Sequence, residues 1–347
     1  MNRRPGDAPR PRTPAALMLS AAVLAACFAG CRSGETAGGG RAELGAADAS
    51  LPAYEDVVAA YNARVSAFGR VWARVTAVYR GVDDAGNRLS EQAEGHLQIE
   101  RPDRVALSLG KLGETYLYLG SNESRYWWID LVDADRKVAL TGTHAEATPA
   151  RIRALGLPVR PPELVEVVGI VPLPVRGGVV ERDTRPGAPP GGFMVTAPRG
   201  GGAGDGGPGG GADSGPSGGP IGGLVRLWFA PEDDDAAGFR GEPTRVALLD
   251  AAGAEVLHAT LGAYQRFGGV DRPRSHRLPR RVRLESDRFE GWARLTMYDP
   301  ERRSINPLVF DPDGLFARLG VDEVIDLDER LERAVSASDG PAGGAVR

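Results

Sequence analysis

The chain has two cysteines, Cys27 and Cys31, and both follow a short apolar stretch near the N-terminus. Arginines precede this stretch, which covers residues 15–26, and small residues stand just before each cysteine. A basic start, a short apolar run and small residues at the cleavage point are the marks of a secretory signal. Cleavage that leaves cysteine as the first mature residue is typical of bacterial lipoproteins, in which the thiol is acylated. The sequence therefore predicts a lipoprotein signal peptide over 1–26 and a lipid on Cys27, with Cys31 as the alternative.

The rest of the chain offers few residues for catalysis or metal binding. Because the only cysteines are the two near the N-terminus, the mature domain has no set of thiols for a disulfide or a zinc site. The four histidines, His96, His144, His258 and His276, are scattered and form no metal-binding spacing. The sequence predicts no catalytic residue, no metal ligand and no cofactor.

The charge balance argues against a nucleic-acid partner. The chain has 42 basic and 46 acidic residues, for a formal net charge of −4, so it has no basic field to attract a polyanion.

The apolar run at residues 15–26 is shorter than the ~20 residues that a membrane-spanning helix needs. We therefore expect the lipid to be the contact with the membrane.

Behind the signal, hydrophobic spacing defines the elements. Residues 27–50 are rich in Gly and Ala and are predicted to be a flexible tether. Apolar residues at helical spacing predict a helix over 54–68. Alternation with period two predicts about ten short strands in two groups. The first group covers 71–79, 94–100, 105–109, 116–119 and 125–131, and the second covers 224–229, 244–249, 256–261, 281–285 and 291–298.

Between the two groups lie two short helical patterns, 148–155 and 162–168, and a glycine-rich insertion at 199–223 that is predicted to be disordered. Because strand signals of the same character resume after the insertion, we expect a single domain over 51–318. A short segment at 306–310 is a candidate last strand. Residues 319–347 are predicted to form a charged helix, over 323–335, and a flexible tail. The fold class is α+β and mostly β: a strongly curved antiparallel sheet, or unclosed β-barrel, covered by the N-terminal helix and short inserted helices.

The pattern resembles the LolA/LolB-like lipoprotein carriers, whose fold is shared with periplasmic sensors of the RseB kind. The residues that carry the resemblance are the helix at 54–68, the strand, Arg-Pro turn and strand at 95–107, and the aromatic hairpin at 116–131. The resemblance implies an unclosed barrel with a helix across an apolar concavity, which holds acyl chains of a lipoprotein or another hydrophobic ligand. The lipid anchor is similar to that of the receptor member, which also carries a protruding loop with an exposed apolar residue. The best candidate for that loop is the insertion at 199–223.

Aromatic and aliphatic side chains are the candidates for a ligand-binding wall. Trp127 and Trp128 lead, but neighbouring residues of a strand face opposite sides, so only one of them can line the hollow. The further candidates share the apolar parity of their strands or the apolar face of the helix: Leu97, Ile99, Leu107, Tyr116, Val58 and Tyr61. An ordinary hydrophobic core gives the same pattern.

We therefore expect a non-enzymatic lipoprotein of the cell envelope, lipid-anchored at the outer membrane and facing the periplasm. Its expected ligands are acyl chains or lipoproteins, with a role in lipoprotein sorting or outer-membrane localisation. The alternative is a structural or sensing module of the same fold, with a filled core and a protein partner. The sequence leaves the oligomeric state open.

Overall fold

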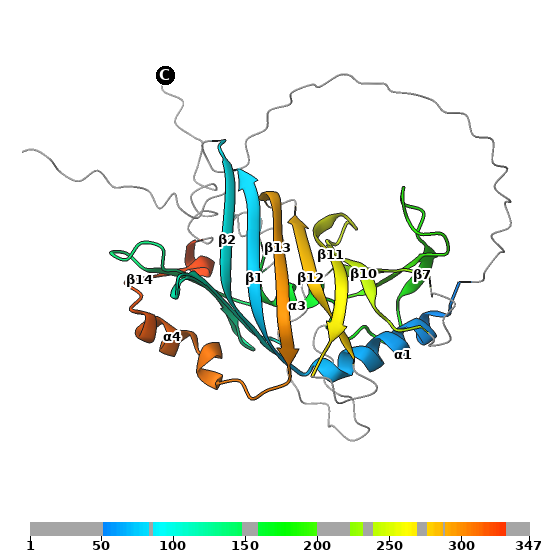
Figure 1. Ribbon diagram of the computed structural model, residues 1–347, viewed down its shortest axis with the longest axis horizontal. Helices are drawn as coiled ribbons and strands as arrows, with labels where there is room; N and C mark the ends of the chain where they lie inside the picture. The colour runs from blue at the N-terminus through cyan, green and yellow to red at the C-terminus, as the bar shows by residue number, and fades with distance from the viewer. Residues whose placement is uncertain are drawn as a thin grey trace, which may run out of the picture.

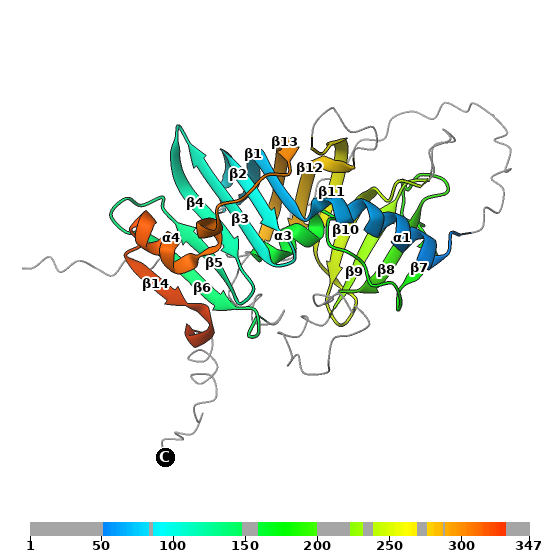
Figure 2. The ribbon, with the colours of Figure 1, turned by 90° about the horizontal axis from the view of Figure 1, so that it is seen from below.

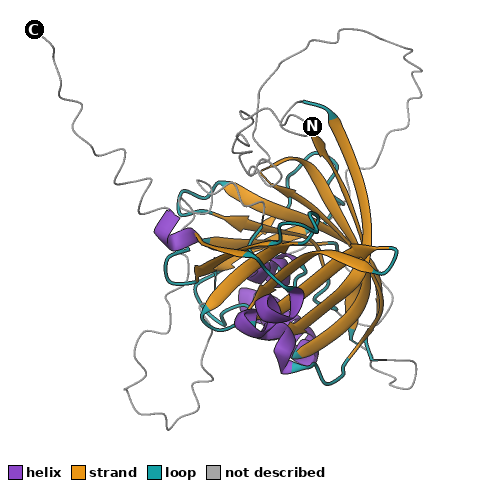
Figure 3. Cartoon of the chain, turned by 90° about the vertical axis from the view of Figure 1, so that its left-hand side faces the viewer, coloured by secondary structure: helices purple, strands orange, loops and turns teal. Residues whose placement is uncertain are grey.

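The computed structural model describes residues 51–82, 86–147, 159–199, 223–231, 239–268, 276–286 and 289–330. The predicted signal peptide, the tether to residue 50, the helical pattern at 148–155 and residues 200–222 of the insertion lie outside this part. Fourteen strands form one sheet, in the order β14-β6-β5-β4-β3-β2-β1-β13-β12-β11-β10-β9-β8-β7. Figure 3 shows how strongly this sheet curves.

The sheet consists of two antiparallel meanders that meet in its middle. The first meander contains β1 (Arg70–Val82), β2 (Arg88–Glu100), β3 (Arg104–Lys111), β4 (Glu114–Ser121), β5 (Arg125–Asp130) and β6 (Val138–Thr143). The second contains β7 (Val179–Arg182), β8 (Phe193–Pro198), β9 (Leu224–Phe229), β10 (Pro243–Leu249), β11 (Glu255–Arg266), β12 (Arg277–Ser286) and β13 (Phe289–Glu301). The last strand of the second meander, β13, pairs with β1, so both meanders belong to one sheet.

The predicted architecture, a curved antiparallel sheet left open as a half-barrel, is confirmed. All ten predicted strands are present, but the count is fourteen because β6, β7, β8 and β14 (Glu323–Asp326) were not expected. Two of these strands, β7 and β14, are four residues long, which is too short to show a period of two. The strands on either side of the insertion, β8 and β9, are antiparallel neighbours, and the backbone N–H of Arg199 donates to the carbonyl of Gly223; this pairing was not predicted.

One prediction near the C-terminus agrees only in part with the structure, and another is wrong. In the charged helix expected over 323–335, the first four residues form β14 instead, because they pair in parallel with the free edge of β6. Residues 327–330 are helical, and residues 331–335 lie outside the described residues. The expected strand at 306–310 is a short 3-10 helix, η2 (Pro307–Phe310), whose first backbone N–H, that of Leu308, donates to the side chain of Asn306 at 3.1 Å. A proline at the start of η2 cannot donate to a sheet, which favours the helical turn. The helix that follows, α4 (Pro312–Leu319), was not predicted.

Helix α1 (Tyr54–Val65) forms where the sequence predicted it and continues into the turn η1 (Ser66–Phe68). Acidic residues occupy its first turn and an arginine its last, which suits the helix dipole. A second helix, α3 (Pro161–Val167), agrees with the pattern at 162–168. It contacts β3 and β4 on one side and β10 on the other, so it lies inside the curve of the sheet. Figures 1 and 2 show α1 along the half of the sheet that ends in β7, and α4 along the half that ends in β14.

Buried apolar side chains form three clusters. The main cluster joins α1 and α3 to inward-facing residues of both meanders. A second cluster packs η2 and α4 against the other face of β3 to β6. A third, small cluster around Trp228 lies on β9 and β10. The concave face of the half-barrel is therefore one continuous apolar surface, with α1 and α3 against it.

Candidate ligand-binding face of the half-barrel

The structure brings most of the predicted site residues together on the concave face. Leu97 and Ile99 of β2 and Leu107 of β3 are at most 3% exposed and belong to the main cluster. Val58 and Tyr61 approach them from α1 and are each 1% exposed. The remaining candidate of this group, Tyr116 of β4, is partly buried and packs at the border of the cluster. These positions are tightly packed where the structure describes them.

The two neighbouring tryptophans of β5 face opposite sides of the sheet, as their spacing predicted. Trp128 belongs to the main cluster on the concave face, and Trp127 belongs to the second cluster with η2 and α4. Trp127 therefore does not line the hollow. Both indole N–H groups are buried and donate to no acceptor among the residues that the structure describes. A buried donor without an acceptor costs about 1–3 kcal/mol, so the N–H of Trp128 leaves one unsatisfied polar group on the concave face.

Hydrogen bonds to one loop hold the outer part of α1. The hydroxyl of Tyr54 donates to the carbonyl of Pro174 at 2.7 Å, and the side chain of Asn62 both donates to and accepts from the backbone of Leu173 at 2.8 Å. Burial raises the pKa of Tyr61 to about 12, so its phenol stays protonated. That phenol donates to the carbonyl of Val171 at 3.0 Å. The loop after α3 therefore fixes α1 in place.

Arg64 fixes the other end of α1. It is 4% exposed and donates to the carbonyl of Gly241 at 2.7 Å, to that of Arg277 at 3.3 Å and to that of Gly169. Its guanidinium also lies over the rings of Tyr61 and Phe68. Sequence reasoning missed this residue because an arginine in the last turn of a helix is typical of an exposed end. The one available signal was its position: Arg64 falls between Tyr61 and Val65 on the apolar face of the helix.

A buried ion pair begins α3 inside the curve of the sheet. The guanidinium of Arg160 lies 3.3 Å from the carboxylate of Glu163, and the two side chains are 5% and 1% exposed. The same carboxylate accepts the backbone N–H of Arg160 at 2.8 Å, which closes a capping box at the start of the helix. The interior of the half-barrel therefore contains a fixed, polar helix start as well as apolar side chains.

The most exposed large apolar residue that the structure describes is Leu112, in the turn between β3 and β4. Its side chain is fully exposed, and its backbone has φ = 54°, a left-handed conformation that costs a non-glycine residue about 1–2 kcal/mol. Because neighbouring strands are antiparallel, the β3–β4 turn and the β8–β9 connection lie at the same ends of the strands. The protruding apolar residue was predicted to lie in the insertion at 199–223 instead. An apolar residue between Lys111 and Gly113 in a hairpin turn was the overlooked signal.

Within the described residues, no group of three His, Cys, Asp or Glu side chains could hold a metal ion. Of the described helices, none has the length and apolar character needed to cross a bilayer.

No protein-family model matches the chain, and no curated protein matches it. Solved structures are similar to it. A domain described as an outer membrane lipoprotein-sorting protein, from Vibrio parahaemolyticus, has a TM-score of 0.45 at 12% identity, over 75% of this chain and 97% of its own. A DUF1329 family protein from Desulfovibrio piger has a TM-score of 0.44 at 10% identity, over 76% and 97%. A LolA superfamily protein from Nitrosomonas europaea has a TM-score of 0.41 at 10% identity, over 76% and 99%. With TM-scores below 0.5, nothing about a ligand or an activity follows from these likenesses.

Proposed function

We propose that this protein is a lipid-anchored protein of the cell envelope that binds acyl chains or another hydrophobic ligand, without covalent chemistry. The observation that carries the proposal is the cluster of buried apolar side chains on the concave face, which runs from β2–β5 to β8–β13 with α1 packed against it. The anchor is the acylated cysteine that the N-terminal signal predicts. Its proposed place is the outer membrane, facing the periplasm, where it takes part in the sorting of lipoproteins.

A comparison of free energies supports reversible loading between α1 and the sheet. Displacing α1 exposes five buried apolar or aromatic side chains, Tyr54, Val57, Val58, Tyr61 and Val65, and breaks the three hydrogen bonds of the buried Arg64. At about 1.5–3 kcal/mol for each of the five side chains, their exposure costs roughly 7–15 kcal/mol, and the lost hydrogen bonds of Arg64 add to this cost. An acyl chain of about sixteen carbons gains on the order of 12 kcal/mol when it is buried, at ~0.8 kcal/mol for each methylene. One chain therefore does not offset the whole cost of displacing the helix, and a ligand with two or three chains is favoured.

The unsatisfied N–H of Trp128 suggests the chemistry at the head of the ligand. It lies on the concave face, and none of the described residues supplies an acceptor for it. An ester or amide carbonyl next to an acyl chain would supply that acceptor. Acylated glycerol and acylated protein N-termini both carry such a carbonyl.

Leu112 supports contact of the β3–β4 turn with a membrane or an incoming lipoprotein. A fully exposed leucine in a left-handed turn is unfavourable for folding, and it presents an apolar tip at one edge of the sheet. We propose that this tip enters the acyl region of the donor while the ligand is transferred.

The direct test is the lipid content of the purified domain. All three hydrophobic clusters are built from residues between Tyr54 and Leu327, so a chain that starts at residue 51 retains them. This chain, secreted without an acylated cysteine and purified without detergent, should release lipid on solvent extraction and should take up a fluorescent fatty acid. If extraction yields no lipid and no fatty acid is taken up, the carrier function is refuted.

A matched pair of variants tests the position of the ligand. Trp128→Phe removes the N–H on the concave face, and Trp127→Phe makes the same change on the opposite face. We expect Trp128→Phe to weaken uptake and Trp127→Phe to leave it unchanged. Equal uptake by both variants would show that the ligand does not contact Trp128.

The lipid anchor is tested separately in cells. With radioactive palmitate, Cys27→Ser should abolish labelling of the protein and Cys31→Ser should not. The opposite result would assign the lipid to Cys31, and labelling of neither parent nor variants would refute the anchor.

A second candidate function follows from the close packing of α1. Its buried residues Val58, Tyr61 and Val65 are at most 1% exposed, as in a filled core. If the domain carries no lipid, a structural or sensing module with a protein partner is the function that this packing favours.

A further inference from the structure

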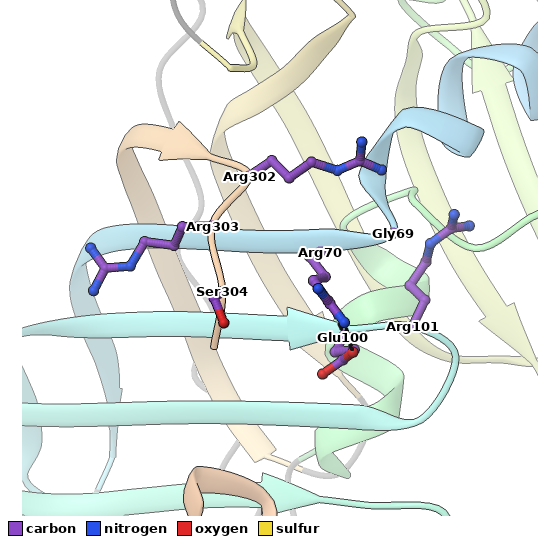
Figure 4. A pocket seen from close by; sticks show the side chains of 7 residues that line it. All are labelled: Gly69, Arg70, Glu100, Arg101, Arg302, Arg303 and Ser304. Carbon is purple, nitrogen blue, oxygen red and sulfur yellow. Dashed lines mark hydrogen bonds and ion pairs between the residues drawn. The ribbon is translucent and has the colours of Figure 1, made fainter. Parts of the chain in front are cut away.

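Four arginines line an open pocket in the middle of the sheet, at the strand ends opposite to those that carry Leu112. The pocket has a volume of about 490 Å³ and lies where the chain passes from η1 into β1, from β2 into β3, and out of β13 (Figure 4). Its lining is Gly69, Arg70, Glu100, Arg101, Arg302, Arg303 and Ser304. The lining therefore contains four arginines and one carboxylate, and it has an excess of positive charge.

Contacts within the fold hold three of these arginines in place. Arg70 pairs with Glu100, with nitrogen–oxygen distances of 3.0 and 2.9 Å. Arg101 donates to the carbonyl of Phe68 at 3.1 Å and to that of Ile170 at 3.3 Å. The guanidinium of Arg303 lies 4.0 Å from the centre of the Trp72 ring, and Figure 4 shows it extending away from the other three.

Two of the arginines have no acidic partner. Among the described residues, no carboxylate pairs with Arg101 or with Arg302. The guanidinium of Arg302 lies beside Gly69, where a Cβ would stand 3.9 Å from its Nη2 atom. Burial also lowers the pKa of Arg101, which shows that its charge is partly removed from water. An anion placed between these groups would restore the lost solvation.

We propose that this pocket binds a phosphate group, held by Arg70, Arg101 and Arg302. Several guanidinium forks around one space suit the oxygens of a phosphate, each of which can accept more than one hydrogen bond. The hydroxyl of Ser304 provides one further donor in the same lining. The phosphate belongs either to a phospholipid headgroup or to a small soluble ester. The pocket lies outside the concave face, so the inference does not depend on acyl binding.

The test is a calorimetric titration of the full chain in neutral detergent at low ionic strength. Three probes are compared: inorganic phosphate, glycerol phosphate, and micelles doped with phosphatidylglycerol. Acetate serves as the carboxylate control. The variants are Arg302→Gln in the pocket and Arg281→Gln, an equal change of charge at an exposed residue of β12 outside it.

We expect at least one phosphate probe to bind and Arg302→Gln to weaken that binding about five-fold, the effect of removing one partly exposed charge. Arg281→Gln should leave the affinity unchanged. Binding of the soluble probes identifies a soluble phosphate, whereas binding of the doped micelles alone identifies a lipid headgroup. The proposal is overturned if no phosphate probe binds, if acetate binds equally well, or if both variants weaken binding to the same degree. Since fatty-acid uptake is not part of this titration, failure here leaves the carrier function to its own test.

Discussion

Replacing Arg64 by methionine should destabilise the protein more than any change of a surface charge. The methionine keeps an unbranched side chain of similar length but removes the guanidinium that joins α1 to three other segments. Those segments are the turn after α3, the chain before β10 and the start of β12, represented by Gly169, Gly241 and Arg277. The change therefore tests whether α1 is held by this contact or only by its apolar face.

The magnitude follows from the contacts that are lost. Two of the three hydrogen bonds are short and one is 3.3 Å, and a bond from a charged donor is worth about 1.5–3 kcal/mol. Three carbonyls lose their donor, while the energy spent on removing the guanidinium from water is recovered. A buried acceptor left without its donor costs about 1–3 kcal/mol, so three such carbonyls, less the recovered energy, give a net loss of about 3–5 kcal/mol. That is a large share of the roughly 5–15 kcal/mol that stabilises a typical domain.

The assay is equilibrium unfolding in urea, followed by tryptophan fluorescence. At the usual urea dependence, the predicted loss lowers the midpoint by roughly 1–2 M. Arg74→Met is the matched control, because Arg74 pairs with Asp299 and the two side chains are 62% and 73% exposed. An exposed pair of this kind is worth less than about 1 kcal/mol. If Arg64→Met costs no more than Arg74→Met, the carbonyl contacts do not hold α1 and the reasoning is wrong.

Three further predictions concern other parts of the molecule. Gly120→Ala should lower the unfolding free energy by about 1–3 kcal/mol, because its Cβ would overlap the ring of Trp127; an unchanged urea midpoint would show that the second cluster yields easily. Leu112→Gly should leave stability unchanged or slightly raised, since glycine accepts φ = 54°, but should slow transfer of a fluorescent lipid from vesicles; a variant that transfers as fast as the parent removes the proposed role of the turn. Burial lowers the pKa of His144 below its ordinary value of 6.5, so the neutral ring stabilises the fold above that pH, and this stabilisation is lost as pH falls from about 6.5 toward the lower folded value. Thermal unfolding of His144→Gln should therefore depend less on pH in that range than the parent does, and identical pH profiles would contradict this account.

The proposed carrier and the proposed phosphate pocket occupy different parts of the half-barrel. The acyl ligand would lie on the concave face under α1, and the phosphate would lie at the strand ends where β1 begins. The exposed Leu112 is at the opposite strand ends. If both proposals hold, a single anchored domain contacts a membrane or a lipoprotein through the turns at one end of its strands and an anionic group through the turns at the other end.

The local spacing of apolar residues was sufficient to predict most of the strands and helices. The alternation in residues 71–79 and 105–109, and the helical spacing in 54–68, each arise from burial of one face, so they can be seen without knowledge of the partner. The opposite orientation of Trp127 and Trp128 also follows from strand geometry alone. The shortest elements were missed: β7 and β14 each have four residues, and their strand conformation depends on pairing with β8 and β6.

The sequence by itself determined the apolar parity of the strands and the mostly-β class, because each depends on residue type and near spacing; the acylation signal at Cys27 or Cys31 stays a prediction from the sequence, outside the described residues. Only the tertiary structure decided that Arg64 is buried, that Leu112 is exposed and that arginines from three separate turns surround one pocket. These features join residues far apart in the chain. Arg64 and Arg277, for example, are 213 positions apart and meet only when the two meanders form one sheet.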